Sequence, residues 1–371
     1  MTYLFDYLVF LAEVITIVVA IMVIVGFLAN NAMKQMPEQS GHLMIRKLNQ
    51  EVKDLKHAMQ GALLDDAVVK VERKAEAKAE KKNAKEAAKE ASKAAKVAAK
   101  TTSQETAQPA TGDGTGAGDA TPDDERKPRT FVLNFEGDVK ASSVEFLRRE
   151  ISAVLTMAEP KDEVVACIES PGGMVHSYGL AASQLARVRG REIPLTVVVD
   201  KVAASGGYLM AAVANKILAA PFALIGSIGV VAQIPNVHRL LKKNDVDVEV
   251  LTAGKHKRTL TTFGENTEEG RAKFIEELED VHTLFQSYVT ENRPELDIAT
   301  VATGEAWYGT RALELNLIDG ISTSDEYLLE ACERSDVFAI SWIEHKKPID
   351  KLMGRVNGVL DQAQALLQGW R

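Results

Sequence analysis

One serine and one lysine are the residues of this chain with the clearest chemical potential. Ser205 lies in Ala204-Ser205-Gly206-Gly207, and Lys257 follows it by 52 residues. A serine hydroxyl is a weak nucleophile at neutral pH, and a lysine amine can take its proton only when the pKa of that amine is depressed. Charged neighbours such as Arg258 would supply part of that shift. The ordinary alternative is a solvated basic turn, because residues 254–258 have the composition of an exposed loop.

The surroundings of Ser205 predict a turn that suits a nucleophile. The apolar run Leu195–Val199 precedes it and a helix-compatible run follows, so Ser205 is expected at a strand-to-helix turn. Backbone amides at a helix start are unpaired and can hold a developing oxyanion. Ser170-Pro171-Gly172-Gly173 repeats this design after the strand predicted at Val164–Ile168. The alternative is that the glycines merely permit close packing of two turns.

Histidines offer a different base for the same serine. No Asp/His pairing is evident around Ser205, which suits a serine–lysine dyad because that dyad needs no aspartate. A serine–histidine variant nevertheless stays open, and His256 is its best candidate because it adjoins Lys257. The histidines considered for that role are His176, His238, His256 and His282.

Taken in order and spacing, these motifs resemble the S49 peptidases, the signal peptide peptidase A family. The resemblance covers roughly Arg129–Glu344, and the set is specific although each member alone is weak. Within the family, the closest resemblance is to the SohB-type branch, because a membrane helix and a long charged segment precede one protease domain. The matching segments are Phe131–Gly137, the Ser-Pro-Gly-Gly turn, Ala204–Tyr208, Gly226–Val230, Lys257 ahead of Phe263, and Ala302–Asp319.

The resemblance implies a serine endopeptidase that needs no metal or organic cofactor. It assigns Ser205 as nucleophile, Lys257 as general base and Ser227 as the residue that orients the lysine. The implied oxyanion donors are backbone amides of Gly172, Gly173 and Gly206. Two positions depart from the family pattern without touching this chemistry: Thr262, where relatives carry proline, and Asn316, where glycine is frequent.

Strand and helix patterns alternate in the second half of the chain and predict an α/β fold with a largely parallel sheet. The resemblance implies a ClpP/crotonase-like fold of repeated ββα units. Strands are expected at Thr130–Phe135, Val164–Ile168, Leu195–Val199, Lys216–Ala219, Ile228–Gln233 and Val246–Leu251; helices are expected at Ser143–Met157, Ser177–Arg189, Tyr208–Asn215, Val237–Asn244 and from Thr267 to about Asn292.

The N-terminus predicts an uncleaved membrane anchor over residues 1–33. Val14–Ala29 is a charge-free apolar run, extended upstream across Glu13, and together they are long enough to span a bilayer. The segment lacks a basic beginning and a good cleavage site, which argues against a removed signal peptide. The resemblance implies a bacterial inner-membrane protein. The side of the membrane stays open, because flanking charge favours the cytoplasm and the family favours the periplasm.

Two segments of different character are expected between anchor and protease domain. Residues 34–100 are predicted as a charged helical spacer, and Arg73–Lys100 carries ten lysines and arginines against four glutamates. Contact with anionic lipid or RNA is the alternative use of that basic stretch. Residues 101–128 are predicted as a disordered linker, residues 129–345 as the protease domain and residues 346–371 as an amphipathic C-terminal helix.

Composition agrees with this reading. The 371-residue chain is 46% hydrophobic, enough for a sizeable core, and its net charge of −8 argues against a nucleic-acid binder. Only two cysteines occur, so no disulfide framework or metal-ligand spacing is present. The expected partners are peptide or protein substrates in signal-peptide-like or membrane-associated chains, membrane lipid, and further copies in a homo-oligomer. The alternatives are a crotonase-like acyl-CoA enzyme and a non-catalytic membrane scaffold.

Overall fold

The computed structural model describes residues 41–65, 126–254 and 256–344, with isolated positions 69, 74, 78, 82 and 85. The chain divides into two compact units, and Met44–Ser341 forms the larger one. The predicted anchor, the predicted C-terminal helix and most of the predicted spacer and linker lie outside the described residues. Within the described residues, no helix combines the length and apolar character that crossing a membrane requires.

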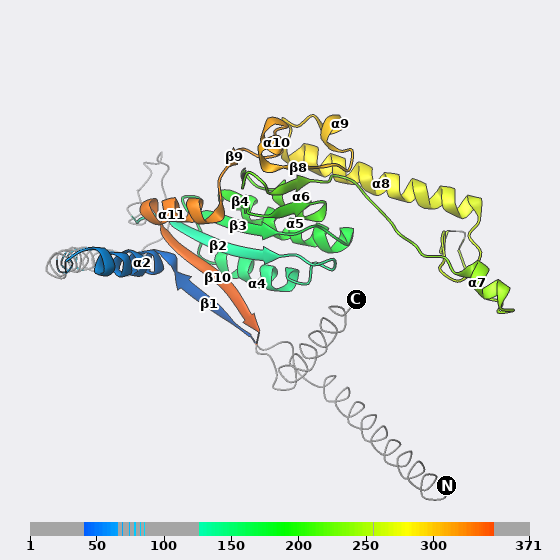
Figure 1. Ribbon diagram of the computed structural model, residues 1–371, viewed down its shortest axis with the longest axis horizontal. Coiled ribbons are helices and arrows are strands. Elements are labelled where there is room, and N and C mark those ends of the chain that lie inside the picture. The colour runs from blue at the N-terminus through cyan, green and yellow to red at the C-terminus, as the bar shows by residue number, and fades with distance from the viewer. Residues whose placement is uncertain are drawn as a thin grey trace, which may run out of the picture. The chain divides into compact units, whose positions relative to one another are not determined.

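A seven-stranded sheet organises the larger unit (Figure 1). Its strand order is β1-β10-β2-β3-β4-β6-β9, and every pairing from β10 to β9 is parallel. The central strands are nearly continuous apolar runs because both faces of a parallel sheet are covered. The strands are β1 (Gly41–Lys47), β2 (Arg129–Glu136), β3 (Glu163–Glu169), β4 (Leu195–Val199), β6 (Lys216–Ala219), β9 (Gly320–Ile321) and β10 (Asp336–Glu344).

Helices pack against the sheet. Tyr327 and Ala331 of α11 pack in one buried cluster with Val132, Val165 and Val198 of successive strands. The helices α4 and α5 pack against each other, and α5 also packs against α6. The helices are α2 (Leu48–Leu63), α4 (Val144–Val154), α5 (Val175–Arg189), α6 (Gly206–Ala211), α7 (His238–Lys243), α8 (Glu268–Asn292), α9 (Ile298–Val301), α10 (Gly309–Glu314) and α11 (Ser324–Arg334).

A second, three-stranded sheet carries the segments of chemical interest. It comprises β5 (Val202–Ala204), β7 (Leu224–Gly226) and β8 (Ala306–Tyr308) in that order. Strands β5 and β7 are parallel, and β8 is antiparallel to β7. An isolated bridge between Ser170 and Ala203 ties the end of β3 to this second sheet. The two glycine-rich turns are therefore brought together where the sheets meet.

The predicted α/β class is confirmed, and most predicted elements form within a few residues of their expected bounds. Strands β4 and β6 match the predicted ranges residue for residue. The predicted start of the long helix is also correct: the Thr267 side chain accepts a hydrogen bond from the Gly270 amide, which caps α8. Local patterning thus fixes these elements well.

Two predicted strands were wrong. Residues 228–233 and 246–251 form no strand in the structure. The alternating apolar pattern of 246–251 suits a sheet, but a strand needs a neighbouring strand to satisfy its backbone groups. In the described chain 246–251 pairs with no strand, and Val248 and Val250 stay exposed. Residues 228–233 form no ladder either, although the Ile228 carbonyl accepts from the Gly304 amide at 3.1 Å. A third correction is small: Arg126–Pro128, at the end of the predicted disordered linker, are tied into the folded domain, since the Pro128 carbonyl accepts from the Asp336 amide.

Residues 44–63, inside the predicted spacer, belong to the larger unit, and Asn49 makes most of the polar contacts that hold them there. The Asn49 side-chain amide donates to the carbonyls of Cys332 and Ser335, each at 2.9 Å. Its oxygen accepts from the Val337 amide at 2.8 Å. Lys47 also pairs with Asp336 at 2.9 Å. Helix α2 is thereby fixed against α11 and the start of β10.

A buried carboxylate fixes the start of the large folded unit after the predicted linker. The Asp162 side chain is 0% exposed and accepts from the guanidinium of Arg126 at 2.7 and 2.8 Å. It also accepts from the Arg129 amide at 2.9 Å and the Arg129 guanidinium at 2.8 Å. Burial raises the pKa of Asp162, but these hydrogen bonds outweigh it and hold that pKa well below its usual range.

Removing this charge should make stability less dependent on pH. Because the folded-state pKa of Asp162 is depressed, its contribution is present above the unfolded value of about 3.9 and fades as pH falls below it. Asp162→Asn is expected to lower the free energy of unfolding by about 2–3 kcal/mol at pH 7. Urea unfolding of the wild type and Asp162→Asn should be measured from pH 7 to pH 3. The difference between their free energies of unfolding should narrow below pH ~4. A difference in unfolding free energy that stays constant across this range would show that the charge of Asp162 does not stabilise the fold.

Candidate active site

Ser205 occupies a strained turn between β5 and α6. Its backbone has φ 50° and ψ −117°, a conformation that non-glycine residues rarely adopt. The turn is held by the Ser205 amide, which donates to the Gly226 carbonyl at 2.8 Å, and by its carbonyl, which accepts from Leu209 at 2.9 Å. Within the described chain the half-buried hydroxyl makes no capping bond to α6. The geometry leaves this oxygen available for chemistry.

The Ser-Pro-Gly-Gly turn lies directly against Ser205. Gly172 is buried with φ +90°, and a Cβ added there would lie 2.7 Å from the Ser205 Cβ and 2.8 Å from the Gly206 amide nitrogen. The Ser170 amide donates to Val202 and its carbonyl accepts from Ala204. Only glycine permits this close approach. The structure therefore joins the two predicted turns into one site.

The three glycines predicted as oxyanion donors differ in what their amides do. The Gly172 amide donates to the Ser170 hydroxyl at 3.1 Å and is already engaged. Gly173 is exposed, and within the described residues its amide donates to no protein group. Gly206 is the first residue of α6, where amides have no partner inside the helix. The amides of Gly173 and Gly206 are thus the available donors.

Ser227 lies beside Ser205. Strands β5 and β7 run parallel with Ala204 opposite Gly226, so the next residue of each is a serine. Ser227 also has a positive φ, at 51°. Its amide donates to Glu305 at 2.6 Å and its hydroxyl to the Gly304 carbonyl at 3.3 Å. The predicted role of Ser227 in orienting a lysine stays a prediction.

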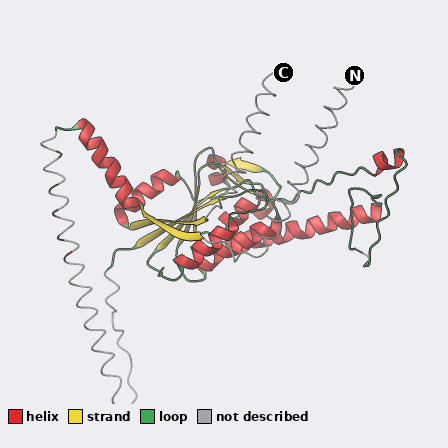
Figure 2. Cartoon of the chain, turned by 90° about the horizontal axis from the view of Figure 1, so that it is seen from below, coloured by secondary structure: helices red, strands yellow, loops and turns green. Residues whose placement is uncertain are grey.

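Lys257 is not brought to Ser205 within one chain. It is exposed in the segment between α7 and α8, where the Thr261 amide donates to the side chain of Asn266, just before α8 begins. Helix α8 has 25 residues, so its two ends are roughly 37 Å apart. Helix α8 also contacts α6, and at its other end Asn292 accepts a hydrogen bond from Arg189 of α5. Figures 1 and 2 both show α8 extending away from the strands toward α7.

The candidate histidines lie away from the nucleophile in the described chain or make no bond to it. His238 is in α7 and His256 is in the exposed segment with Lys257. His282 is on α8, with its Nε2 3.2 Å from the Gln286 side chain. His176 is exposed in the first turn of α5, close in sequence to Gly173. None of the hydrogen bonds of the described residues links a histidine to Ser205.

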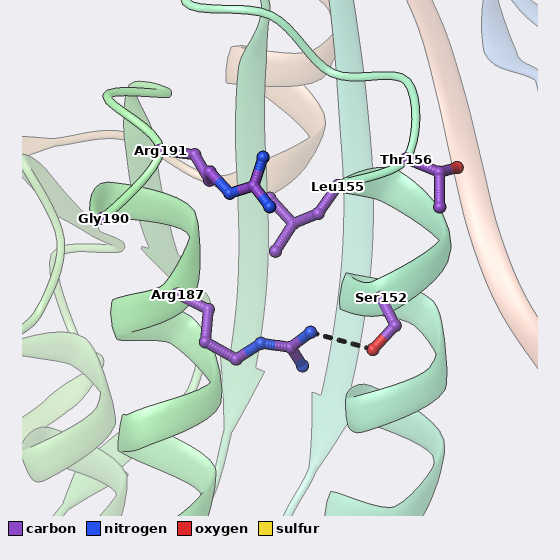
Figure 3. A pocket seen from close by; sticks show the side chains of 6 residues that line it. All are labelled: Ser152, Leu155, Thr156, Arg187, Gly190 and Arg191. Carbon is purple, nitrogen blue, oxygen red and sulfur yellow. Dashed lines mark hydrogen bonds between the residues drawn. The ribbon is translucent and has the colours of Figure 1, made fainter.

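A surface hollow of 430 Å³ lies elsewhere, where α4 and α5 end (Figure 3). Arg187 donates to the Ser152 hydroxyl across it at 3.0 Å. Its other lining residues are Leu155, Thr156, Gly190 and Arg191. No predicted site residue lines this hollow, so it is separate from the nucleophile turn.

Two polar residues next to the site were not found from the sequence. Tyr178 of α5 is buried, and its hydroxyl is 2.5 Å from the Ser170 hydroxyl and 2.8 Å from the Asp138 carbonyl. In the sequence Tyr178 reads as one more large residue on a helix face. For Ser170, the sequence indicates only a place in the Ser-Pro-Gly-Gly turn. Nothing local distinguishes a tyrosine used for packing from one used for a hydrogen-bond chain.

Comparison with known proteins identifies the family of this arrangement. Residues 2–185 match the model described as peptidase family S49 N-terminal, and residues 187–337 match peptidase family S49. The chain belongs to peptidase family S49. The resemblance inferred from the motifs is therefore confirmed.

Two bacterial proteins are highly similar to this chain. The probable protease SohB of Haemophilus influenzae is 58% identical over 235 residues, covering 63% of this chain and 66% of that protein. The probable protease SohB of Buchnera aphidicola subsp. Acyrthosiphon pisum is 53% identical over 236 residues, covering 64% and 70%. The chain therefore spans about two thirds of the length of these relatives.

A solved structure is also similar at low identity. It is the 1510-N membrane-bound stomatin-specific protease, in a lysine-to-alanine mutant bound to a substrate peptide. The identity is 14% and the TM-score 0.38, over 62% of this chain and 98% of that one.

Proposed function

We propose that this protein is a serine endopeptidase with Ser205 as nucleophile and Lys257 as general base. The observation that carries the proposal is the strained Ser205 turn in direct contact with the Gly172-Gly173 turn. Membership of a peptidase family and similarity to probable proteases support the reaction class. The same membership supports the assignment of the domain to the ClpP/crotonase-like fold.

In the proposed reaction, the Ser205 hydroxyl oxygen attacks the carbonyl carbon of the peptide bond while its proton passes to the Lys257 amine. The carbonyl oxygen becomes an oxyanion and accepts hydrogen bonds from the amides of Gly173 and Gly206. The lysine then returns a proton to the departing amine as the C–N bond breaks. Water hydrolyses the resulting Ser205 ester by the same steps and restores the free hydroxyl.

We further propose that Lys257 reaches Ser205 from a second copy of the chain. The length of α8 separates the two residues within one chain. The segment that carries Lys257 also exposes apolar side chains, including Leu251 at 89% and Phe263 at 55%. Its strand-like pattern has no partner in the described chain. A homo-oligomer would cover these side chains and complete the site, with Ser227 beside the incoming amine.

The proposed substrates are signal-peptide-like or membrane-associated polypeptides, and the proposed location is the bacterial inner membrane. Two observations support this. The apolar N-terminal run has the length of a membrane span. The similar proteins named SohB come from bacteria. An anchored protease with a groove for extended peptides would meet such segments where they leave the bilayer.

Substitution of the two proposed catalytic residues tests this function. The purified full-length chain is expected to cleave casein, and Ser205→Ala and Lys257→Ala should each reduce the rate by about 1,000-fold or more. Ser152→Ala and Lys56→Ala, the latter at an exposed lysine of α2, are matched controls that should keep the wild-type rate. Circular dichroism should show that all four variants are folded. Cleavage that survives either Ser205→Ala or Lys257→Ala would refute the proposed mechanism.

A further inference from the structure

A buried tyrosine lies directly beneath the nucleophile turn. The Tyr178 side chain is 0% exposed, and a Cβ added to Gly206 would lie 2.3 Å from its Cγ. Its ring also meets Phe135 of β2 edge-on, with centroids 6.3 Å apart. Packing of this kind fixes the ring and therefore the position of its hydroxyl oxygen.

Hydrogen bonds from this hydroxyl form a chain whose direction follows from the number of protons. The Asp138 carbonyl can only accept, so the Tyr178 hydroxyl donates its one proton there at 2.8 Å. The Ser170 hydroxyl must then donate to the tyrosine oxygen, 2.5 Å away. The Ser170 oxygen in turn accepts from the Gly172 amide at 3.1 Å. The chain runs from Gly172 through Ser170 and Tyr178 to Asp138.

Both ends of this chain are fixed by backbone contacts. The loop that contains Asp138 is joined to the Ser-Pro-Gly-Gly turn, because the Met174 amide donates to the Val139 carbonyl at 2.8 Å. Gly137 leaves room for the chain, since a Cβ there would lie 2.4 Å from both hydroxyl oxygens. Burial raises the pKa of Tyr178, although the hydrogen bond from Ser170 opposes this, so the proton that it donates is retained at neutral pH.

The chain decides which amide of the turn faces the reacting atoms. The Gly172 amide donates to the buried Ser170 hydroxyl, and Gly172 itself is buried. The exposed Gly173 amide that follows is left for a substrate oxygen. Were the Gly172 amide released, the peptide unit on either side of this φ +90° glycine would be free to rotate. The direction of the Gly173 amide would then be lost.

We propose that Tyr178 and Ser170 are positioning residues that hold the Gly173 amide in place as an oxyanion donor. The inference rests on the proposed peptidase function. It assigns to the Tyr178 hydroxyl a role in the rate of the chemical step in addition to its role in packing. Neither residue touches the substrate in this account, because both act through Gly172.

The test compares two buried tyrosines near the nucleophile turn, Tyr178 of α5 and Tyr208 of α6. Tyr208 is also 0% exposed, and its hydroxyl donates to the Leu317 carbonyl at 2.9 Å, away from the Ser-Pro-Gly-Gly turn. Tyr178→Phe in the full-length chain is expected to lower kcat 10- to 100-fold, as an indirect loss of one oxyanion donor should, with KM within about twofold. Both substitutions remove one buried hydrogen bond and should lower the melting temperature by similar amounts. Tyr208→Phe, however, is expected to leave kcat unchanged.

Two further measurements separate positioning from a structural role. The double variant Ser170→Ala/Tyr178→Phe should be no slower than the slower single variant, because both break one chain. A peptide aldehyde, which forms a tetrahedral adduct with a serine, should lose affinity by the same factor as kcat in Tyr178→Phe but not in Tyr208→Phe.

The outcomes distinguish this inference from the proposed function. Equal kcat values for the two tyrosine variants, or a loss confined to KM, would overturn the positioning role. If cleavage survives Ser205→Ala, the peptidase proposal itself fails. If cleavage is lost in Ser205→Ala but unaffected by Tyr178→Phe, only the positioning role fails.

Discussion

Co-expressed Ser205→Ala and Lys257→Ala chains are expected to regain activity that neither variant has alone. In a mixed assembly, a chain that keeps Ser205 can lie beside a chain that keeps Lys257. With equal amounts and random assembly, half of the chains carry each intact residue, so roughly one quarter of the wild-type rate should return. The restored rate would exceed that of either single variant by more than about 100-fold.

This experiment follows from the length of α8 and the exposed position of Lys257. Different affinity tags on the two chains allow mixed assemblies to be purified and their rate of casein cleavage measured. A chain that carries both substitutions, co-expressed with wild type, is the control for assembly itself. Purified mixed assemblies without activity would show that Lys257 does not act across copies.

The second large effect is expected from adding one methyl group at Gly172. In Gly172→Ala the new Cβ would lie 2.7 Å from the Ser205 Cβ and 2.8 Å from the Ala204 carbonyl oxygen. Neither neighbour can yield without moving the nucleophile, and φ +90° is itself unfavourable for alanine. We expect a loss of more than about 100-fold in kcat/KM, measured with casein or a peptide, and lower stability by about 1–3 kcal/mol.

Gly179→Ala is the matched control for this substitution. Gly179 lies in α5, and a Cβ there would meet no atom within 4 Å. Alanine should therefore leave the activity unchanged and stabilise the helix by about 0.5–1 kcal/mol. Equal activity of Gly172→Ala and wild type would show that the contact between the two turns is not needed for catalysis.

Local sequence patterns predicted the central strands of the large sheet and the helices beside the site, but not β5, β7 and β8 of the second sheet. Short apolar runs indicate buried parallel strands such as β4. Thr267, a capping residue followed by acidic residues, indicates the start of α8. The turn that holds Ser205 was predicted from its place between such a strand and a helix. These features depend on neighbouring residues in the chain, so they can be predicted from a single sequence.

Features that depend on distant partners were missed or mispredicted. Strand β1 and the bonds of Asn49 join positions nearly 300 residues apart, as the Val337–Asn49 separation of 288 shows. The segment 246–251 has the right pattern for a strand but no neighbour in the described chain. The hydrogen-bond chain through Tyr178 depends on a loop 40 residues away. Periodicity carries no information about such partners.

The central claim is that Ser205 is an activated nucleophile, and covalent labelling tests it most directly. The full-length protein would be treated with a fluorophosphonate and the modified residue located by mass spectrometry of its peptides. We expect a single labelled serine, Ser205, with labelling slowed in Lys257→Ala and absent in Ser205→Ala. Labelling at another serine that persists in Ser205→Ala, or an unmodified Ser205 in a protein that still cleaves casein, would contradict the claim.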